Sequence, residues 1–185
     1  MNLKATIGME THVELDTKSK MFCSCEVVET DEPNISVCPT CLGLPGALPV
    51  PNKTAIEYIV MLSLGANCNI TNEGMFHRKN YFYPDLPKNY QISQFDFPVG
   101  VNGSLEIVLD EKLHSVEIER VHMEEDTGKS VHIGSGRIDS ATSTLLDFNR
   151  SGIPLVEVVT KPVISTSKMA VAYICLLYTS PSPRD

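Results

Sequence analysis

The spacing of four cysteines constrains the fold of this chain more than any other feature of its sequence. Cys23-x-Cys25 is followed, after twelve residues, by Cys38-x-x-Cys41. Two close thiolate pairs joined by a loop match tetrahedral zinc, and such a closed site leaves no position for a substrate. Four unrelated thiols are the alternative, and a disulfide framework is less favoured because the first residues lack an export signal. We therefore predict a structural zinc site.

A second pattern lies before the cysteines, where residues 6 to 15 alternate between apolar and polar side chains. One face of this predicted strand is apolar and consists of Ile7, Met9, Val13 and Leu15. The other face carries Glu10, His12 and Glu14. A solvated polar face is the ordinary interpretation of such a strand, and an acidic metal site is the functional one.

A distant acidic cluster favours the metal site. Residues 122 to 126 read His-Met-Glu-Glu-Asp at the end of another predicted strand. Like charges held together are unfavourable unless a cation neutralises them. Alternation places His122 and Glu124 on one face and Glu125 on the other, but a strand end can break this rule. The pattern leaves open which glutamate binds the metal.

Two lysines flank a short segment rich in aromatic residues and proline. Lys79 and Lys88 enclose Asn-Tyr-Phe-Tyr-Pro-Asp-Leu-Pro, in which Tyr81 and Tyr83 alternate. Lysines on a rigid loop can hold phosphate oxygens as point charges. The aromatic rings suit stacking on a base and packing in a core equally well.

Charge and motif content exclude several functions. The formal net charge of −8 argues against a broad nucleic-acid footprint on these residues. No apolar run is long enough to cross a membrane, so we expect a cytoplasmic protein. Gly128-Lys129-Ser130 resembles the end of a P-loop, but Met123 stands where that motif requires glycine. No nucleophile elbow of a hydrolase occurs either.

The order of predicted elements indicates an α+β fold built from antiparallel hairpins. We expect a helix from Asn52 to about residue 65 and a second helix near Lys168, capped by Ser165 or Ser167. Asn102-Gly103 predicts a hairpin turn, and a second turn is expected near residue 110. Strands are predicted at 105–109, 115–123, 145–147 and 153–160. Three prolines between residues 75 and 98 limit regular structure there.

Four segments together resemble one known family, the B subunits of the aspartyl/glutamyl-tRNA amidotransferases (the GatB family). They are residues 7–15, 78–94, 120–129 and 146–159. The resemblance implies a curved antiparallel sheet with few helices, similar to glutamine synthetase and guanido kinases. It also implies that the B subunit uses ATP to phosphorylate Glu-tRNA(Gln) or Asp-tRNA(Asn). Ammonia released from glutamine by the A subunit, an amidase, would then form the amide, and the C subunit would hold the other two together.

The resemblance also assigns roles to individual residues. It implies magnesium ligands at Glu10, His12 and Glu125, with Glu124 close by. The implied catalytic residues are Lys79, Lys88, Glu124 and Glu125. The residues implied to line the nucleotide site are Tyr81, Tyr83, Asp147, Asn149 and Arg150. The cysteine quartet is similar to a zinc knuckle found in part of the family.

The resemblance sets the expected domain organisation. Residues 1–173 would form the front part of a catalytic cradle domain, with the zinc knuckle inserted at about 21–48. The helical and tail domains of the family, which help to hold tRNA, are absent, and residues 174–185 look like a non-native tail. The archaeal paralogue specific for Glu-tRNA(Gln) is less favoured by His12-Val13-Glu14-Leu15. A zinc-stabilised interaction module without chemistry is the alternative of a different class.

Overall fold

The computed structural model describes residues 3–134 and 141–179, and the predicted α+β class is confirmed. The helices are α1 (Lys53–Gly65) and α2 (Ser167–Thr179). The first strands are β1 (Glu10–Glu14), β2 (Asn69–Ile70), β3 (His77–Asn80), β4 (Tyr90–Ser93) and β5 (Gly100–Leu109). The later strands are β6 (Lys112–Glu125), β7 (Lys129–Ile133), β8 (Ser143–Asp147) and β9 (Pro154–Thr160).

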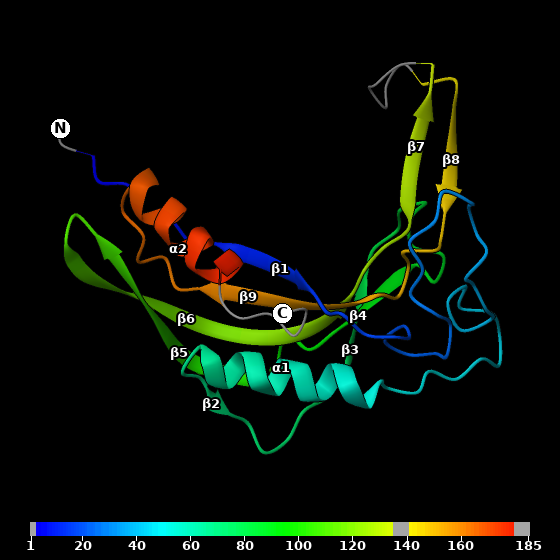
Figure 1. Ribbon diagram of the computed structural model, residues 1–185. Coiled ribbons are helices and arrows are strands. Elements are labelled where there is room, and N and C mark those ends of the chain that lie inside the picture. Colours follow the sequence, from blue (N-terminus) through cyan, green and yellow to red (C-terminus); the bar gives the residue numbers. More distant parts are fainter. Residues whose placement is uncertain (1–2, 135–140, 180–185) are drawn as a thin grey trace.

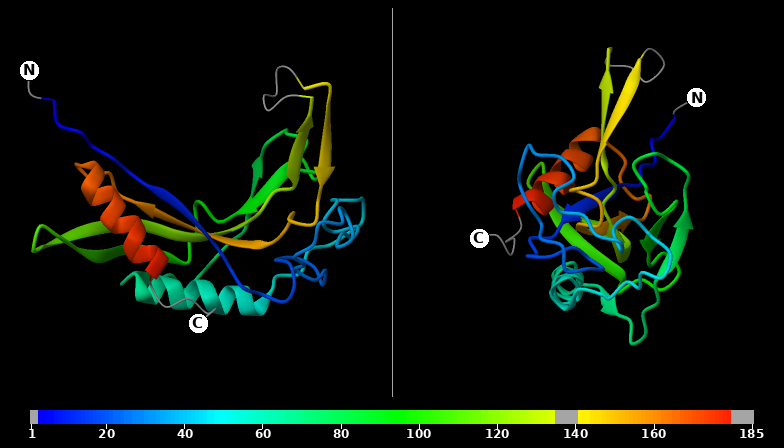
Figure 2. Two further views of the ribbon diagram at one scale, coloured as in Figure 1. Left: turned by 45° about the horizontal axis from the view of Figure 1, so that its top comes forward. Right: turned by 90° about the vertical axis from the view of Figure 1, so that its right-hand side faces the viewer.

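Seven strands form one antiparallel sheet around the long strand β6. The order across the sheet is β1-β9-β6-β4-β3, while β5 pairs with β6 and also with β2. The sheet bends strongly along β6, and the β7–β8 ribbon projects from one end of it as a separate two-stranded arm (Figures 1 and 2). The first and last strands of the chain, β1 and β9, therefore lie side by side, although 139 residues (15–153) separate them in the sequence.

A β-bulge in β6 decides which side chains face the core. The register between β6 and β9 shifts between Ile118 and Arg120. Upstream of the bulge Val116 and Ile118 are fully buried, and downstream of it Val121 and Met123 are buried in the same core. The extra residue thus changes the alternation from even to odd positions. As a result His122 and Glu124 lie on the opposite face of the sheet.

Both helices contribute to this single core. Ala55 and Ile59 of α1 and Met169 and Tyr173 of α2 belong to the same apolar cluster as Val156 of β9. The helices therefore cover the apolar face of the curved sheet, and they leave its polar face, which carries His122 and Glu124, uncovered (Figure 2).

The ends of the helices partly follow the predictions. The Asn52 side chain accepts hydrogen bonds from the N–H groups of Thr54 and Ala55, which confirms the predicted cap of α1. At α2 the predicted caps are wrong, because the Thr166 hydroxyl, rather than that of Ser165 or Ser167, accepts the N–H of Met169. The expected tail at 174–185 overlaps α2, which continues to Thr179. Residues 180–185 lie outside the described residues.

The turn predicted at Asn102-Gly103 is wrong, since both residues lie inside β5. Asn102 has a φ of 53°, and a Cβ at Gly103 would come within 2.5 Å of the Ala66 carbonyl oxygen. Gly103 is thus required by close approach of two backbones, not by a turn. The hairpin turn is at Asp110 and Glu111, both with positive φ, as predicted near residue 110.

Regular structure also occurs where prolines were expected to limit it. β3 and β4 pair between residues 77 and 93, with the proline-containing segment as the loop between them.

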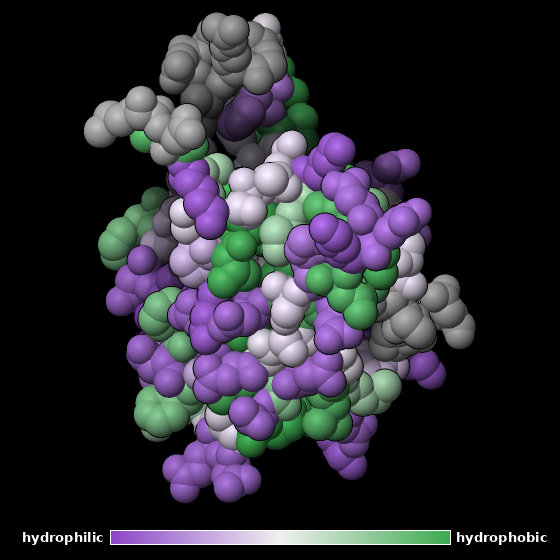
Figure 3. Space-filling view, turned by 90° about the vertical axis from the view of Figure 1, so that its left-hand side faces the viewer, coloured by the Kyte–Doolittle hydropathy of each residue, from purple (hydrophilic) through white to green (hydrophobic). Residues whose placement is uncertain are grey.

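Neither described helix combines the length and apolar character needed to cross a bilayer. The end of the molecule that carries the β5–β6 turn presents mostly hydrophilic residues, with apolar ones in separate small groups (Figure 3).

Candidate active site and metal centre

A row of polar side chains crosses three neighbouring strands on the open face of the sheet. The register pairs His12 of β1 with Glu157 of β9, and Glu157 with His122 of β6. Nε2 of His12 lies 3.7 Å from Oε1 of Glu157, and Nε2 of His122 lies 2.9 Å from Oε2 of the same carboxylate. Directly opposed residues in a sheet are close neighbours, so the backbone register itself brings these groups together.

Glu124 joins the row from the end of β6. One of its carboxylate oxygens lies 3.5 Å from Nε2 of His12, and the other lies 3.5 Å from Nε2 of His122. The Ser93 hydroxyl donates a hydrogen bond of 3.1 Å to Oε1 of Glu124, and Nζ of Lys79 lies 3.8 Å from the same oxygen. The side chain of Glu124 is 4% exposed and that of Lys79 is 60% exposed. The ammonium group of the exposed Lys79 side chain therefore approaches the buried carboxylate of Glu124 from the solvent side.

The histidine and the two carboxylates shift one another's ionisation. Burial lowers the pKa of His122, but its hydrogen bonds to Glu124 and Glu157 outweigh burial and raise the pKa above its ordinary value. The hydrogen bond from His122 lowers the pKa of Glu157. For Glu124, burial raises the pKa, but the bond from His122 and the charge of Lys79 lower it overall. The cluster thus favours one imidazolium between two carboxylates.

Three members of the row have a geometry suited to a metal ion. One ligand atom each from His12, Glu124 and Glu157 lies within 4.8 Å of the others. Carboxylate oxygens are the usual ligands of magnesium, and an imidazole nitrogen also suits several transition metals. His12 is half-exposed, so the group opens towards solvent. Glu10 is an exposed residue on the same face of β1, but it is not part of this group.

Glu125, also predicted as a metal ligand, lies on the other face of β6. Its carboxylate forms an ion pair with Nζ of Lys88 and accepts the backbone N–H of Ile92 at 3.0 Å. Both side chains of the pair are buried, with exposures of 7% for Lys88 and 2% for Glu125. Strand alternation therefore holds to the end of β6. The structure groups Glu124, rather than Glu125, with His12.

Lys79 and Lys88 accordingly have different environments. Lys88 is enclosed by Glu125 and by the loop that carries the four cysteines (the cysteine loop, residues 21–48). A Cβ at Gly43 of this loop would come within 2.5 Å of Cγ of Lys88.

Tyr81 and Tyr83 stack on each other with their ring centroids 5.9 Å apart. They are 44% and 38% exposed, so neither ring is part of the core.

Asp147 and Asn149 connect the loop after β8 to the cysteine loop. Oδ1 of Asp147 accepts the N–H groups of Asn34 and Asn149. Oδ1 of Asn149 accepts the N–H of Ser36 at 2.9 Å, and its Nδ2 donates to the Glu32 carbonyl at 2.8 Å. These polar atoms are therefore engaged within the chain, in positioning one loop on another.

The side chain of Arg150, which follows β8, likewise binds another loop of the chain, the one that follows β6. Its guanidinium donates to the carbonyls of Thr127 at 3.0 Å and Gly128 at 2.9 Å, and lies 3.4 Å from Oδ2 of Asp126. Burial raises the pKa of Asp126, although the charge of Arg150 opposes this shift. Arg150 thus fixes the segment that comes directly after Glu124 and Glu125.

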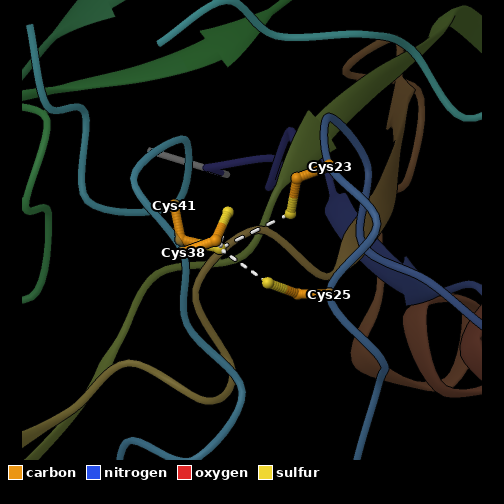
Figure 4. A group of neighbouring side chains, drawn as sticks. All are labelled: Cys23, Cys25, Cys38 and Cys41. Atoms are coloured by element: carbon orange, nitrogen blue, oxygen red, sulfur yellow. Dashed lines mark hydrogen bonds between the residues drawn. The ribbon is translucent and has the colours of Figure 1, made fainter.

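The four predicted cysteines converge, with their sulfurs pointing towards one another from two turns of the same loop (Figure 4). Sγ of Cys41 lies 3.5 Å from that of Cys23, 3.6 Å from that of Cys38 and 3.7 Å from that of Cys25. Zn–S bonds of about 2.3 Å in a tetrahedron require S–S distances of about 3.8 Å. Disulfide sulfurs would lie about 2 Å apart, so the arrangement fits zinc and excludes a disulfide here.

The thiols of the quartet are strongly coupled, and Cys41 is the most acidic. The hydrogen bond with Cys23, and more weakly the charge of Lys20, lower the pKa of Cys41 to about 4. The same bond raises the pKa of Cys23, and burial raises that of Cys25 to about 11. Already without a cation, the cluster favours a thiolate at Cys41, which is the form that binds a metal.

Two residues of these sites were not singled out from the sequence. Glu157 is the one charged residue in the mostly apolar strand β9, and that isolated charge was the available signal. Lys20 lies beside the first cysteine pair, where nothing in the pattern distinguishes it from an exposed lysine.

Comparison with known proteins places the chain in a family. Residues 5–180 match the family model described as the GatB/GatE catalytic domain. Three similar relatives are each named as the B subunit of an aspartyl/glutamyl-tRNA(Asn/Gln) amidotransferase. The protein of Frankia casuarinae is 56% identical over 91% of this chain, and that of Nocardia farcinica is 57% identical over 89%. That of Mycobacterium tuberculosis is 55% identical over 89%.

These matches cover 34%, 33% and 33% of the three relatives, so the chain spans about a third of their length. The match to the family model, in contrast, covers nearly the whole chain. The chain belongs to the GatB/GatE catalytic domain family.

Proposed function

We propose that this chain is the front part of the catalytic domain of the B subunit of a glutamine-dependent tRNA amidotransferase. The enzyme is a ligase that forms a carbon–nitrogen bond in translation. It phosphorylates the side-chain carboxylate of Glu-tRNA(Gln) or Asp-tRNA(Asn) with ATP, and ammonia then displaces the phosphate to give the amide. The name of the relatives supports this assignment. The observation that carries it is the cluster of His12, Glu124 and Glu157 beside Lys79.

Phosphoryl transfer needs cations at the phosphate oxygens, and the residues of the cluster suit this task. We propose that His12, Glu124 and Glu157 hold a divalent metal, with Glu10 next to them along β1. A magnesium ion held by these residues would supply positive charge to offset the negative charge that develops during phosphoryl transfer. His122 orients the two carboxylates through its bonds to both.

The two lysines would act differently. The exposed ammonium of Lys79 lies close to Glu124 and is free to approach phosphate or acyl-phosphate oxygens from solvent. Lys88 is paired with Glu125 on the opposite face of β6, so this buried pair is better suited to supporting the strand behind the cluster than to holding nucleotide. The exposed rings of Tyr81 and Tyr83 are available to line the nucleotide site or to stack on a base.

The proposed architecture is the cradle of the glutamine synthetase and guanido kinase fold. A bent antiparallel sheet with both helices on its apolar face supports this proposal. In that scheme the residues at about 21–48 are an insert that carries structural zinc. Asp147, Asn149 and Arg150 shape the site by fixing loops rather than by contacting ATP.

The proposed partners in a heterotrimer are an amidase (the A subunit) and the C subunit, in the cytoplasm where translation takes place. The tRNA would be held mainly by parts of the B subunit outside these residues. The acidic balance of the chain, 23 Asp and Glu against 15 Lys and Arg, supports this division.

ATP turnover by the complete heterotrimer tests the proposal. We expect His12→Ala to lower Glu-tRNA-dependent ATP turnover at least about 100-fold while glutamine hydrolysis persists. His114→Ala, the same change on β6 away from the cluster, is the matched control. Wild-type ATP turnover in His12→Ala would refute the site and favour a zinc-stabilised interaction module without chemistry.

A further inference from the structure

Lys20 is a fully buried lysine whose role is not explained by the proposed reaction. Its side chain is 0% exposed. Nζ donates to the Ser36 carbonyl at 2.7 Å and to the Phe148 carbonyl at 3.1 Å, and it lies 3.7 Å from Sγ of Cys41. None of these three acceptors is a carboxylate.

A buried ammonium requires a counter-charge as well as hydrogen bonds. Burying an unpaired ion costs several kcal/mol, and partial charges on carbonyls replace only part of its hydration. The Ser36 and Phe148 carbonyls satisfy two of the three N–H bonds and bring no net charge. Cys41 is therefore the contact that can supply a negative charge, as a thiolate.

The cysteine site, in contrast, has an excess of negative charge when zinc is bound. Four thiolates and one Zn²⁺ sum to a net charge of about −2, which is costly to bury without a cation nearby. Cys41 lies within 3.7 Å of each of the other three sulfurs, so it is the centre of the quartet. A cation at Cys41 offsets charge where the four thiolates are closest together.

We propose that Lys20 is a positioning residue of the cysteine metal site, where its ammonium neutralises part of the charge of the four-thiolate zinc complex. It holds the Cys41 sulfur in its ligating position, as groups around a metal site commonly orient the ligands. Through the Phe148 carbonyl it also joins the metal site to the loop that carries Asn149 and Arg150. This inference rests on the proposed zinc site and not on the amidotransferase reaction.

Zinc affinity of the purified chain, measured by competition with a chromophoric chelator, tests the inference. Lys20→Met keeps most of the length of the side chain and removes its charge, and we expect it to weaken zinc binding about 10- to 100-fold. Lys18→Met removes the same charge from an exposed position two residues away and should bind zinc like the wild type.

Stability with and without zinc separates this role from simple packing. We expect Lys20→Met to be destabilised more when zinc is bound than when zinc is removed, because the four-thiolate zinc complex carries about two negative charges and the zinc-free quartet carries one thiolate at Cys41. If Lys20→Met does not fold, Lys20→Gln retains a donor for the two carbonyls and undergoes the same measurements.

Wild-type zinc affinity in a folded Lys20 variant would overturn the inference. Equal destabilisation with and without zinc would also overturn it. A wild-type chain that takes up no zinc at all would refute the metal site itself, and the amidotransferase proposal would be unaffected.

Discussion

The buried ion pair between Lys88 and Glu125 allows a quantitative prediction for Glu125→Gln. The substitution preserves the shape of the side chain, and an amide oxygen can still accept the N–H of Ile92. It removes the charge that faces Nζ of Lys88, whose side chain is only 7% exposed. The lysine would then be buried without its counter-ion.

Loss of one partner of a buried pair typically costs about 3–5 kcal/mol, whereas replacing both partners by neutral groups is often nearly neutral. We therefore expect Glu125→Gln to lower the free energy of unfolding by about 3–5 kcal/mol. The double variant Lys88→Met/Glu125→Gln should recover most of this loss. With an m-value of about 2 kcal/mol/M in urea, the single variant shifts the unfolding midpoint by about 1.5–2.5 M.

Urea unfolding of the wild type, Glu125→Gln, Lys88→Met and the double variant, with zinc present, measures the coupling energy between the two side chains. Glu106→Gln, the same change at an exposed position of β5, serves as control and should shift stability by less than about 0.5 kcal/mol. The reasoning is refuted if the double variant loses as much as the two single variants added together, or if Glu125→Gln unfolds at the wild-type midpoint.

Three further predictions concern the cluster, the loops and the cysteines. The raised pKa of His122 means that its stabilisation is complete below about pH 6.5 and is lost as pH rises through the folded-state pKa. The pKa values of Glu124 and Glu157 are lowered in the folded state, so the stabilisation that these two carboxylates provide is lost as pH falls through their folded-state pKa values. Urea midpoints measured against pH should thus decline on both sides, and His122→Gln should lack the alkaline decline; an unchanged alkaline slope would contradict this. Asn149→Ala leaves the buried N–H of Ser36 without its acceptor and should cost about 1–3 kcal/mol in thermal unfolding, with less than about 0.5 kcal/mol counting against the loop assignment. Cys38→Ser should lower bound zinc below one per chain and lower the melting temperature, and full zinc content would argue against a four-cysteine site.

Local patterns in the sequence were sufficient to predict several features of the sites. The spacing of the cysteines predicted their convergence, because two turns of a single loop bring both pairs together. Alternation predicted the polar face with His12, and also that His122 and Glu124 share a face opposite Glu125. These predictions depend only on the chain near each residue.

Features that depend on distant segments were not predictable in the same way. The bulge at Ile118 to Arg120 determines which face of β6 is buried, and no turn residue marks it in the sequence. The contact of Glu157 with His12 and His122 results from the register of β9 between β1 and β6. Asn102-Gly103 has the local chemistry of a turn, but packing against Ala66 keeps it within a strand.

The same distinction explains the loop residues after β8. Asp147, Asn149 and Arg150 occur in a segment with a strong family resemblance, which suggested contacts with nucleotide. In the structure their polar atoms bind backbone groups of the cysteine loop and of the loop after β6. A residue type alone cannot distinguish a ligand-binding group from one that fixes a neighbouring loop.

The most direct test of the central claim is the effect of Glu157→Gln on phosphoryl transfer. Glu157 contacts both His12 and His122, and it entered the proposed site through geometry alone. In the complete heterotrimer, we predict that Glu157→Gln lowers Glu-tRNA-dependent ATP turnover at least about 100-fold, while glutamine hydrolysis persists and Glu106→Gln retains full turnover. Full ATP turnover by a folded Glu157→Gln variant would contradict the proposed metal site.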